Sequence, residues 1–126
     1  MKVTKEVRDE RKKQTAEVFT PLPLVNEILD RLPEDSWQKD KTFCDPAAGN
    51  GNFLIEVLKR KLSLGHDPKK ALSTVYGVEL MHDNVVEMRM RLFNIIKDKI
   101  DHKEAVDILT KNIVCHNALT YDWDFK

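Results

Sequence analysis

Two glycines in the segment 45–52 (DPAAGNGN) constrain the fold of this chain more than any other feature. The segment follows residues 42–45 (TFCD), a short run that is typical of a strand. Residues 53–62 come next and repeat apolar side chains at helical spacing. Gly49 and Gly51 can adopt backbone conformations that other residues avoid, and they let a ligand approach the main chain closely. The pattern predicts a strand, a glycine turn and a helix in direct succession.

The alternation of strand and helix continues along the chain. Residues 73–80 (STVYGVEL) and 112–115 (NIVC) are typical of strands, and two amphipathic patterns, 85–96 and 101–110, lie between them. Strands that alternate with helices indicate a parallel sheet built from right-handed βαβ units. We therefore predict an α/β fold with about three parallel strands and flanking helices.

Polar residues stand at the carboxyl ends of these predicted strands, where open α/β sheets bind their ligands. Asp45 ends the first strand, Glu79 ends the second, and His116 and Asn117 follow the third. A carboxylate such as that of Glu79 can accept hydrogen bonds from both hydroxyls of a ribose. A nicotinamide dinucleotide is the less favoured ligand, because Leu54 stands where its fingerprint requires a third glycine.

An N-terminal helical segment, residues 1–40, is expected to precede the sheet-forming part, residues 41–126, in one compact unit. Thr20 is expected to cap a helix with Pro21 in its first turn, and Pro33 is expected to end it. The apolar stripe of this helix consists of Leu24, Val25, Ile28, Leu29 and Leu32.

The composition excludes several classes of protein. The 126 residues include 21 Lys and Arg in total and 21 Asp and Glu in total. The chain therefore lacks the excess of basic residues that is typical of a protein that binds nucleic acid by itself. No apolar run approaches the roughly 18 residues that span a bilayer, and we expect that the charged N-terminus does not act as a secretory signal. We expect a cytoplasmic protein without membrane contact. Residues 1–13 have a net charge of +3 and are expected to form a solvated extension or an arm that contacts phosphate groups. Residues 34–41 are expected to form a polar loop.

The two cysteines and four histidines match no metal-binding motif, so no metal site is expected. Cys44 and Cys115 are expected to be buried free thiols on two strands that are separated by a third. Two strand spacings amount to about 10 Å, which exceeds the Cα separation that a disulfide tolerates.

Four segments stand in a characteristic order: 17–21 (EVFTP), 45–54 (DPAAGNGNFL), 78–80 (VEL) and 116–119 (HNAL). They resemble motifs of S-adenosylmethionine-dependent, adenine-specific DNA methyltransferases from restriction–modification systems and phages. Residues 45–54 resemble that family's DPAxGxGxFL motif, and residues 78–80 resemble its acidic ribose-binding motif. The resemblance covers about residues 14–120 and implies a Rossmann-like methyltransferase half-sheet.

The resemblance also implies a binding site for S-adenosylmethionine. Glu79 would accept hydrogen bonds from the ribose hydroxyls, and Leu80 would pack against the adenine ring. Asn117 stands where the family usually has Asp, and its amide oxygen can still accept from the adenine amino group. The alternative for Asn117 is a plain turn residue. The other expected cofactor-binding residues, around the methionine end, are Phe19, Thr20, Pro21, Asp45, Ala47, Gly49 and Gly51.

The catalytic motif of the resembled family, a polar residue followed by two prolines and an aromatic residue, is absent. The five prolines stand at positions 21, 23, 33, 46 and 68, and no two are adjacent. We therefore expect a cofactor-binding part that has no catalytic residue and is inactive alone. It would act on DNA only with a second methyltransferase polypeptide. The alternative is a non-enzymatic cofactor-binding or regulatory module derived from a methyltransferase.

In the resembled family a fourth strand pairs beside the first, so residues 42–45 are expected to form an open sheet edge. Open edges favour pairing with another chain. We expect a homo-oligomer, a partner that supplies a strand, or coverage of this edge by residues 121–126.

Overall fold

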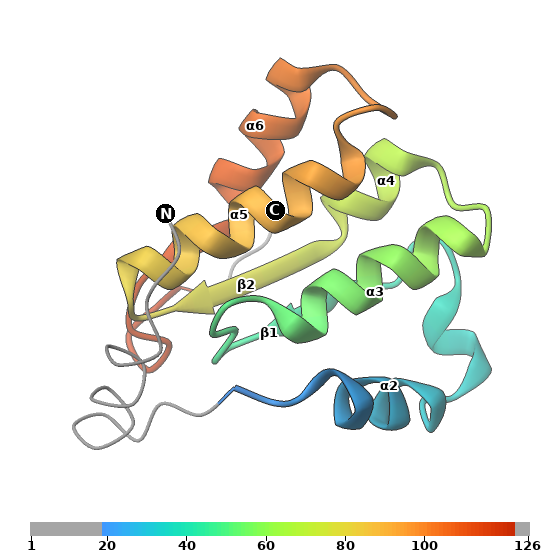
Figure 1. Ribbon diagram of the computed structural model, residues 1–126, viewed down its shortest axis with the longest axis horizontal. Coiled ribbons are helices and arrows are strands. Elements are labelled where there is room, and N and C mark those ends of the chain that lie inside the picture. Colours follow the sequence, from blue (N-terminus) through green and yellow to red (C-terminus); the bar gives the residue numbers. More distant parts are fainter. Residues whose placement is uncertain (1–18, 123–126) are drawn as a thin grey trace.

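A computed structural model describes residues 19–122, which form an α/β fold around three parallel strands (Figure 1). The strands are β1 (Phe43–Asp45), β2 (Val75–Glu79) and β3 (Ile113–Cys115), in the spatial order β1-β2-β3. The predicted fold class is confirmed, and β1 is an outer strand of the described sheet. The predicted arm at residues 1–13 and the last four residues of the predicted tail lie outside the described residues.

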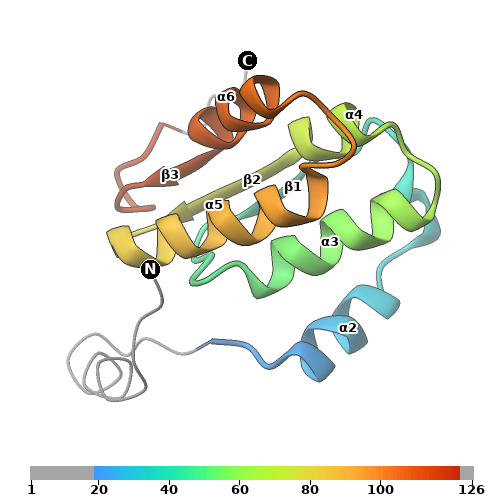
Figure 2. The ribbon, with the colours of Figure 1, turned by 45° about the horizontal axis from the view of Figure 1, so that its top comes forward.

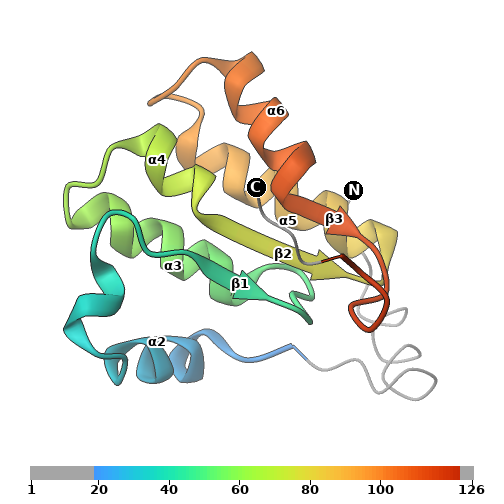
Figure 3. The same ribbon diagram turned by 180° about the vertical axis from the view of Figure 1, so that it is seen from behind.

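Helices α3 (Asn52–Ser63) and α5 (His82–Ile96) cover one face of the sheet, and Figure 3 shows the strands in front of both. Helix α2 (Leu22–Asp30) lies beside α3, and α6 (His102–Asn112) lies beside α5. Helices α2, α3 and α5 follow one another in this order, whereas in the view of Figure 2 the strands β2 and β3 lie between α5 and α6. The short helix α4 (Pro68–Ser73) leads into β2.

The amphipathic helices contribute their apolar faces to one core that they share with the sheet. The largest fully buried apolar side chains are Leu54, Leu58, Leu72, Met88, Leu92, Ile96, Ile113, Val25, Val57, Val75 and Val78. Asp67 and Asp101 cap α4 and α6, since their carboxylates accept hydrogen bonds from backbone N–H groups of the first turn. Within residues 19–122 no helix combines the length and apolar character that crossing a membrane requires.

Helix α2 begins one residue later than predicted. Its N-cap is Pro21, which is extended with a ψ of 147°, and no side chain caps the helix. The prediction of Thr20 as the cap is therefore wrong. Because Thr20 lies one residue ahead of the N-cap, its hydroxyl is not at the position from which caps reach the first turn.

The predicted end of α2 and its predicted apolar stripe also need correction. The helix ends at Asp30, ahead of Pro33, and a 3-10 helix, η1 (Glu34–Trp37), forms within the predicted loop. Of the predicted stripe, only Val25 and Leu29 are buried. Leu24 and Ile28 are 45% and 40% exposed, so α2 presents apolar surface to the outside.

Both cysteines are free and exposed, which contradicts the prediction of buried thiols. Side chains alternate between the faces of a strand, so Cys44 points away from the face to which Phe43 and Asp45 belong. Cys115 is the last residue of the outer strand β3. The prediction that a third strand, β2, separates the two thiols is confirmed.

A buried lysine fixes the amino ends of β1 and β2. Lys61, near the end of α3, is 0% exposed. Its Nζ donates to the carbonyl oxygen of Lys41, at 2.8 Å, and to the hydroxyl of Thr74. The same atom lies 5.1 Å from the centre of the Phe43 ring. Burial lowers the pKa of Lys61 to about 8, because a low-dielectric environment disfavours its charged form.

Candidate functional site

The carboxylate of Glu79, at the end of β2, reaches the glycine turn that follows β1. Its Oε1 accepts a hydrogen bond from the backbone N–H of Gly49 at 3.1 Å. Its Oε2 accepts from the backbone N–H of Met81 at 3.1 Å and from Nδ2 of Asn84 at 3.0 Å. Since Glu79 is only 9% exposed, these three donors compensate for the water that its carboxylate has lost.

Both glycines of the turn have a backbone conformation that favours glycine, and neither position has room for a side chain. Gly49 has a φ of +56° and Gly51 a φ of +93°, values that side-chain-bearing residues rarely adopt. A Cβ on Gly49 would lie 2.7 Å from Cδ1 of Phe19, and one on Gly51 would lie 2.7 Å from Cγ of Met88. The turn is therefore held closely between the segment that precedes α2 and the buried face of α5.

Asp45 brings a second carboxylate to the same edge of the sheet. Its Oδ1 accepts a hydrogen bond from the backbone N–H of Ala47 at 3.0 Å and so shapes the start of the turn. Burial raises the pKa of Asp45 and the nearby negative charge of Glu79 raises it further, while the Ala47 bond opposes both effects. Two acidic side chains at one edge favour a ligand that carries hydroxyl or amino donors.

The turn and the segment before α2 enclose a cavity of about 270 Å³. Its volume is near the lower end of the range for small-molecule sites, roughly 300–1,000 Å³. Its lining combines two aromatic rings with backbone amides, amide side chains and one carboxylate. The lining residues are Phe19, Thr20, Asp45, Ala47, Ala48, Gly49, Asn50, Asn52 and Phe53.

Comparison with known proteins identifies the family of the chain. The family model described as N-6 DNA Methylase matches residues 4–123. The chain belongs to the N-6 DNA methylase family. The strand order and the glycine turn at the carboxyl edge agree with a Rossmann-like methyltransferase half.

One known protein is similar to this methylase-family chain over a shorter stretch. The Type II methyltransferase M.VspI of Vibrio sp. (strain 343) is 48% identical over 42 residues. The matched stretch covers 33% of this chain and 10% of that protein. No solved structure matches the chain.

Five predicted site residues of this N-6 DNA methylase chain do not line the cavity. Two of them, Gly51 and Glu79, belong to the turn and to its hydrogen bonds, and the other three lie farther out. Pro21 is the N-cap of α2, and Leu80 is 61% exposed directly after Glu79. Asn117 is exposed, and its Oδ1 accepts a hydrogen bond from the backbone N–H of Leu119 at 2.9 Å. The side chain of Asn117 therefore stabilises its own turn in this structure.

Sequence reasoning missed a hydrogen-bonded chain that ties α5 to the glycine turn. Nη1 of Arg91 donates to the carbonyl oxygen of Asn50 and to Oδ1 of Asn52, both at 2.9 Å. Nδ2 of Asn52 in turn donates to the carbonyl oxygen of Thr20 at 2.8 Å. Asn50 and Asn52 occupy variable positions of the DPAxGxGxFL pattern, and Arg91 resembles any polar residue of an amphipathic helix. The sequence therefore carried no signal for this network.

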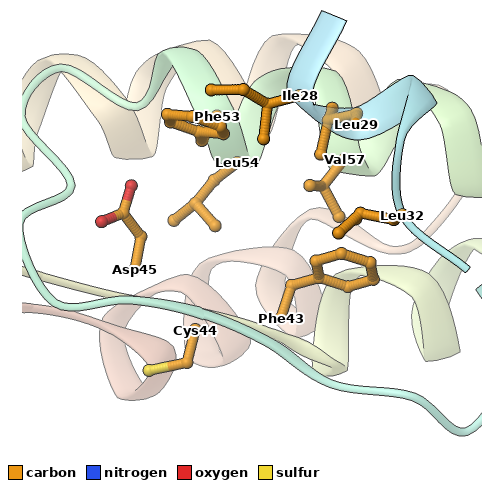
Figure 4. A pocket seen from close by; sticks show the side chains of 9 residues that line it. All are labelled: Ile28, Leu29, Leu32, Phe43, Cys44, Asp45, Phe53, Leu54 and Val57. Carbon is orange, nitrogen blue, oxygen red and sulfur yellow. The ribbon is translucent and has the colours of Figure 1, made fainter. Parts of the chain in front are cut away.

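An apolar groove adjoins the cavity and follows β1 between α2 and α3 (Figure 4). Asp45 and Phe53 line both the groove and the cavity. Away from Asp45 the lining side chains are almost entirely apolar. They are Ile28, Leu29, Leu32, Phe43, Cys44, Leu54 and Val57. The groove lies on the β1 side of the sheet, where no described strand pairs.

Proposed function

We propose that this chain is the S-adenosylmethionine-binding part of an adenine-specific DNA methyltransferase. The observation that carries the proposal is the Glu79 carboxylate, held 3.1 Å from the backbone N–H of Gly49 at the carboxyl edge of a parallel sheet. This geometry places a hydroxyl acceptor beside a turn that has no Cβ at its tightest points, and ligands of open α/β sheets bind at this edge. Family membership supports the same ligand class.

The residues around the turn fit the chemical groups of this cofactor. Glu79 would hold the ribose hydroxyls, and Leu80, which is exposed beside it, would cover the adenine ring. Asn117 retains a second lone pair on its amide oxygen for the adenine amino group. The methionine end would lie in the cavity, in contact with Phe19, Thr20, Asp45, Ala47 and Gly49. Pro21 and Gly51 would support it from outside the lining, through the segment before α2 and through the conformation of the glycine turn. When bound, S-adenosylmethionine supplies an electrophilic methyl group.

Binding and transfer are separate steps in this proposal. The sequence contains no adjacent prolines, so it lacks the family motif that holds the target adenine. We infer that the chain alone transfers no methyl group, and that it acts on DNA in the cytoplasm together with a second copy or a second methyltransferase polypeptide. The groove beside β1 supports this inference, because it joins the cavity at Asp45 and Phe53 and offers a partner an apolar surface.

Isothermal titration calorimetry with S-adenosylmethionine tests the binding step. We expect saturable binding by the wild-type chain, and affinity at least tenfold weaker in Glu79→Ala, because hydrogen bonds to a charged group contribute roughly 1.5–3 kcal/mol. Glu34→Ala is the matched control, since Glu34 is exposed in η1 at the opposite end of β1. A wild-type chain without heat of binding would refute the proposal.

A methyl-transfer assay with labelled cofactor and DNA tests the second step. The chain alone should leave the DNA unlabelled, because the sequence lacks the motif that orients the adenine amine for attack. Incorporation of labelled methyl by the purified chain would show that another part of this sequence performs catalysis.

A further inference from the structure

The carboxylate of Glu79 is held unequally at its two oxygens. Oε2 accepts two hydrogen bonds, from the backbone N–H of Met81 and from Nδ2 of Asn84. Oε1 accepts one, from the backbone N–H of Gly49. A carboxylate offers about four lone-pair sites, two on each oxygen. Oε2 is therefore fully used by these two donors, whereas Oε1 keeps one acceptor position beside the glycine turn.

Both donors to Oε2 come from the start of α5. Met81 is the N-cap of this helix, and Asn84 is its third residue. Asn84 is 0% exposed, and its amide lies 3.0 Å from Oε2. A buried amide in this position is fixed by packing and cannot be replaced by water, so it constrains the rotation of the carboxylate more than an exposed donor would.

We propose that Asn84 is a positioning residue that turns Oε1 of Glu79 toward the nucleoside. This inference rests on the proposed binding of S-adenosylmethionine. Asn84 holds Oε2 on the side of α5, so the acceptor position left on Oε1 receives a ribose hydroxyl. A neutral amide suits this role because it orients the carboxylate without neutralising its charge, and the full negative charge remains available to the ligand.

The first test compares the affinity for S-adenosylmethionine of three proteins by calorimetry. Asn84→Ala should bind about tenfold more weakly than the wild type, because it loses one hydrogen bond to a charged group. Asn94→Ala should bind as the wild type does, since Asn94 is exposed and lies ten positions farther along the same helix. Thermal unfolding followed by circular dichroism checks that both variants are folded.

The second test uses Asn84→Asp, which keeps the size of the side chain. Its introduced carboxyl can donate to Oε2 only while protonated, and when ionised it repels the Glu79 charge. We expect its affinity, relative to the wild type at the same pH, to be about tenfold lower at pH 8 and within about twofold at pH 5.5. Asp45 also interacts with Glu79, but it is present in both proteins and its titration cancels in this ratio. A loss of affinity through altered packing alone would not vary with pH in this way.

The outcomes separate this inference from the proposed function. A wild-type chain that does not bind the cofactor refutes the proposed function and the inference together. If the wild type binds and Asn84→Asp equals it at pH 8, or is weakened equally at both pH values, the positioning role is wrong and the proposed function stands. Should Asn84→Ala fail to fold, the pH profile of Asn84→Asp alone decides.

Discussion

Three described glycines have a left-handed backbone, but they differ in what surrounds them. A Cβ on Gly49 would lie 2.7 Å from the ring of Phe19, whereas a Cβ on Gly65 would meet nothing within 4 Å. Both positions have positive φ values, +56° and +86°. A side chain introduced at Gly65 would therefore cost stability through backbone strain alone. One introduced at Gly49 would add a steric clash with the ring of Phe19.

Replacement of each glycine by alanine should separate these two costs. We expect Gly65→Ala to lower the free energy of unfolding by about 1–2 kcal/mol through backbone strain. Gly49→Ala should cost more, by roughly a further 1–3 kcal/mol, because the new methyl group overpacks the turn against Phe19. Urea unfolding measures both values.

A second substitution tests the cause of the larger loss. Phe19→Ala removes the ring that the methyl group meets, so Gly49→Ala should cost no more than Gly65→Ala when made in that background. Equal costs of the two glycine replacements in the wild-type background would contradict the close contact between Phe19 and the turn.

At the scale of single residues, the sequence predicted those whose chemistry is tied to a strand end. Glu79 and Gly49 were predicted at one edge because parallel strands bring their carboxyl ends together, and the structure brings them into hydrogen-bond contact. Asn84 and Arg91 were not predicted. Their roles depend on the rotation of α5 about its axis, and many other polar residues of helices share their local pattern.

Among the helices and strands, the sequence predicted every described strand and long helix to within a few residues. Apolar periodicity reports the buried face of an element, which is the property that tertiary packing preserves. The predicted start of α2 was wrong, because the N-cap of this helix is Pro21 and not Thr20. The 3-10 helix η1 was missed because four residues are too short for a periodic pattern to appear.

Lys61 links α3 to the amino ends of β1 and β2, and its described contacts include no acidic side chain. It is anchored by neutral oxygens of Lys41 and Thr74 and by the Phe43 ring, so its positive charge is buried without ionic compensation. A folded-state pKa of about 8, against the usual 10.5, means that the folded chain holds fewer protons than the unfolded chain between these pH values. The free energy of unfolding therefore rises with pH across this window.

We expect this rise to disappear in Lys61→Met. Between pH 8 and pH 10 the wild type should gain about 2 kcal/mol of stability relative to that variant, as measured by urea unfolding at each pH. Lys59→Met, which changes an exposed lysine of the same helix, should retain the wild-type rise. The same pH profile in Lys61→Met and the wild type would show that Lys61 is not the group responsible.

The molecule as a whole is asymmetric about its sheet. Within residues 19–122 both β1 and β3 are outer strands of the sheet, but the apolar groove follows β1 alone, between α2 and α3, while α5 and α6 pack beside β3 (Figures 3 and 4). Exposed Leu24 and Ile28 of α2 extend the apolar surface next to this groove. Such a surface favours association, because an unpaired strand edge and apolar side chains are removed from water together.

We expect association through the β1 side to depend on Ile28, which lines the groove. In sedimentation velocity the average mass of the wild type should rise with protein concentration, and Ile28→Lys should remain monomeric at concentrations where the wild type associates. Met90→Lys provides the control, because it places the same charge on an exposed apolar residue between α5 and α6. A wild type that is monomeric at every concentration would contradict this expectation.

The position of the two exposed thiols gives this chain a pair of intrinsic reporters. Cys44 lies on one outer strand and Cys115 on the other, so alkylating reagents reach opposite flanks of the same sheet. A molecule that covers the β1 flank slows the modification of Cys44, and Cys115 serves as an internal standard for reagent strength. The ratio of the two labelling rates, read by mass spectrometry, therefore maps which flank is occupied without any engineered probe.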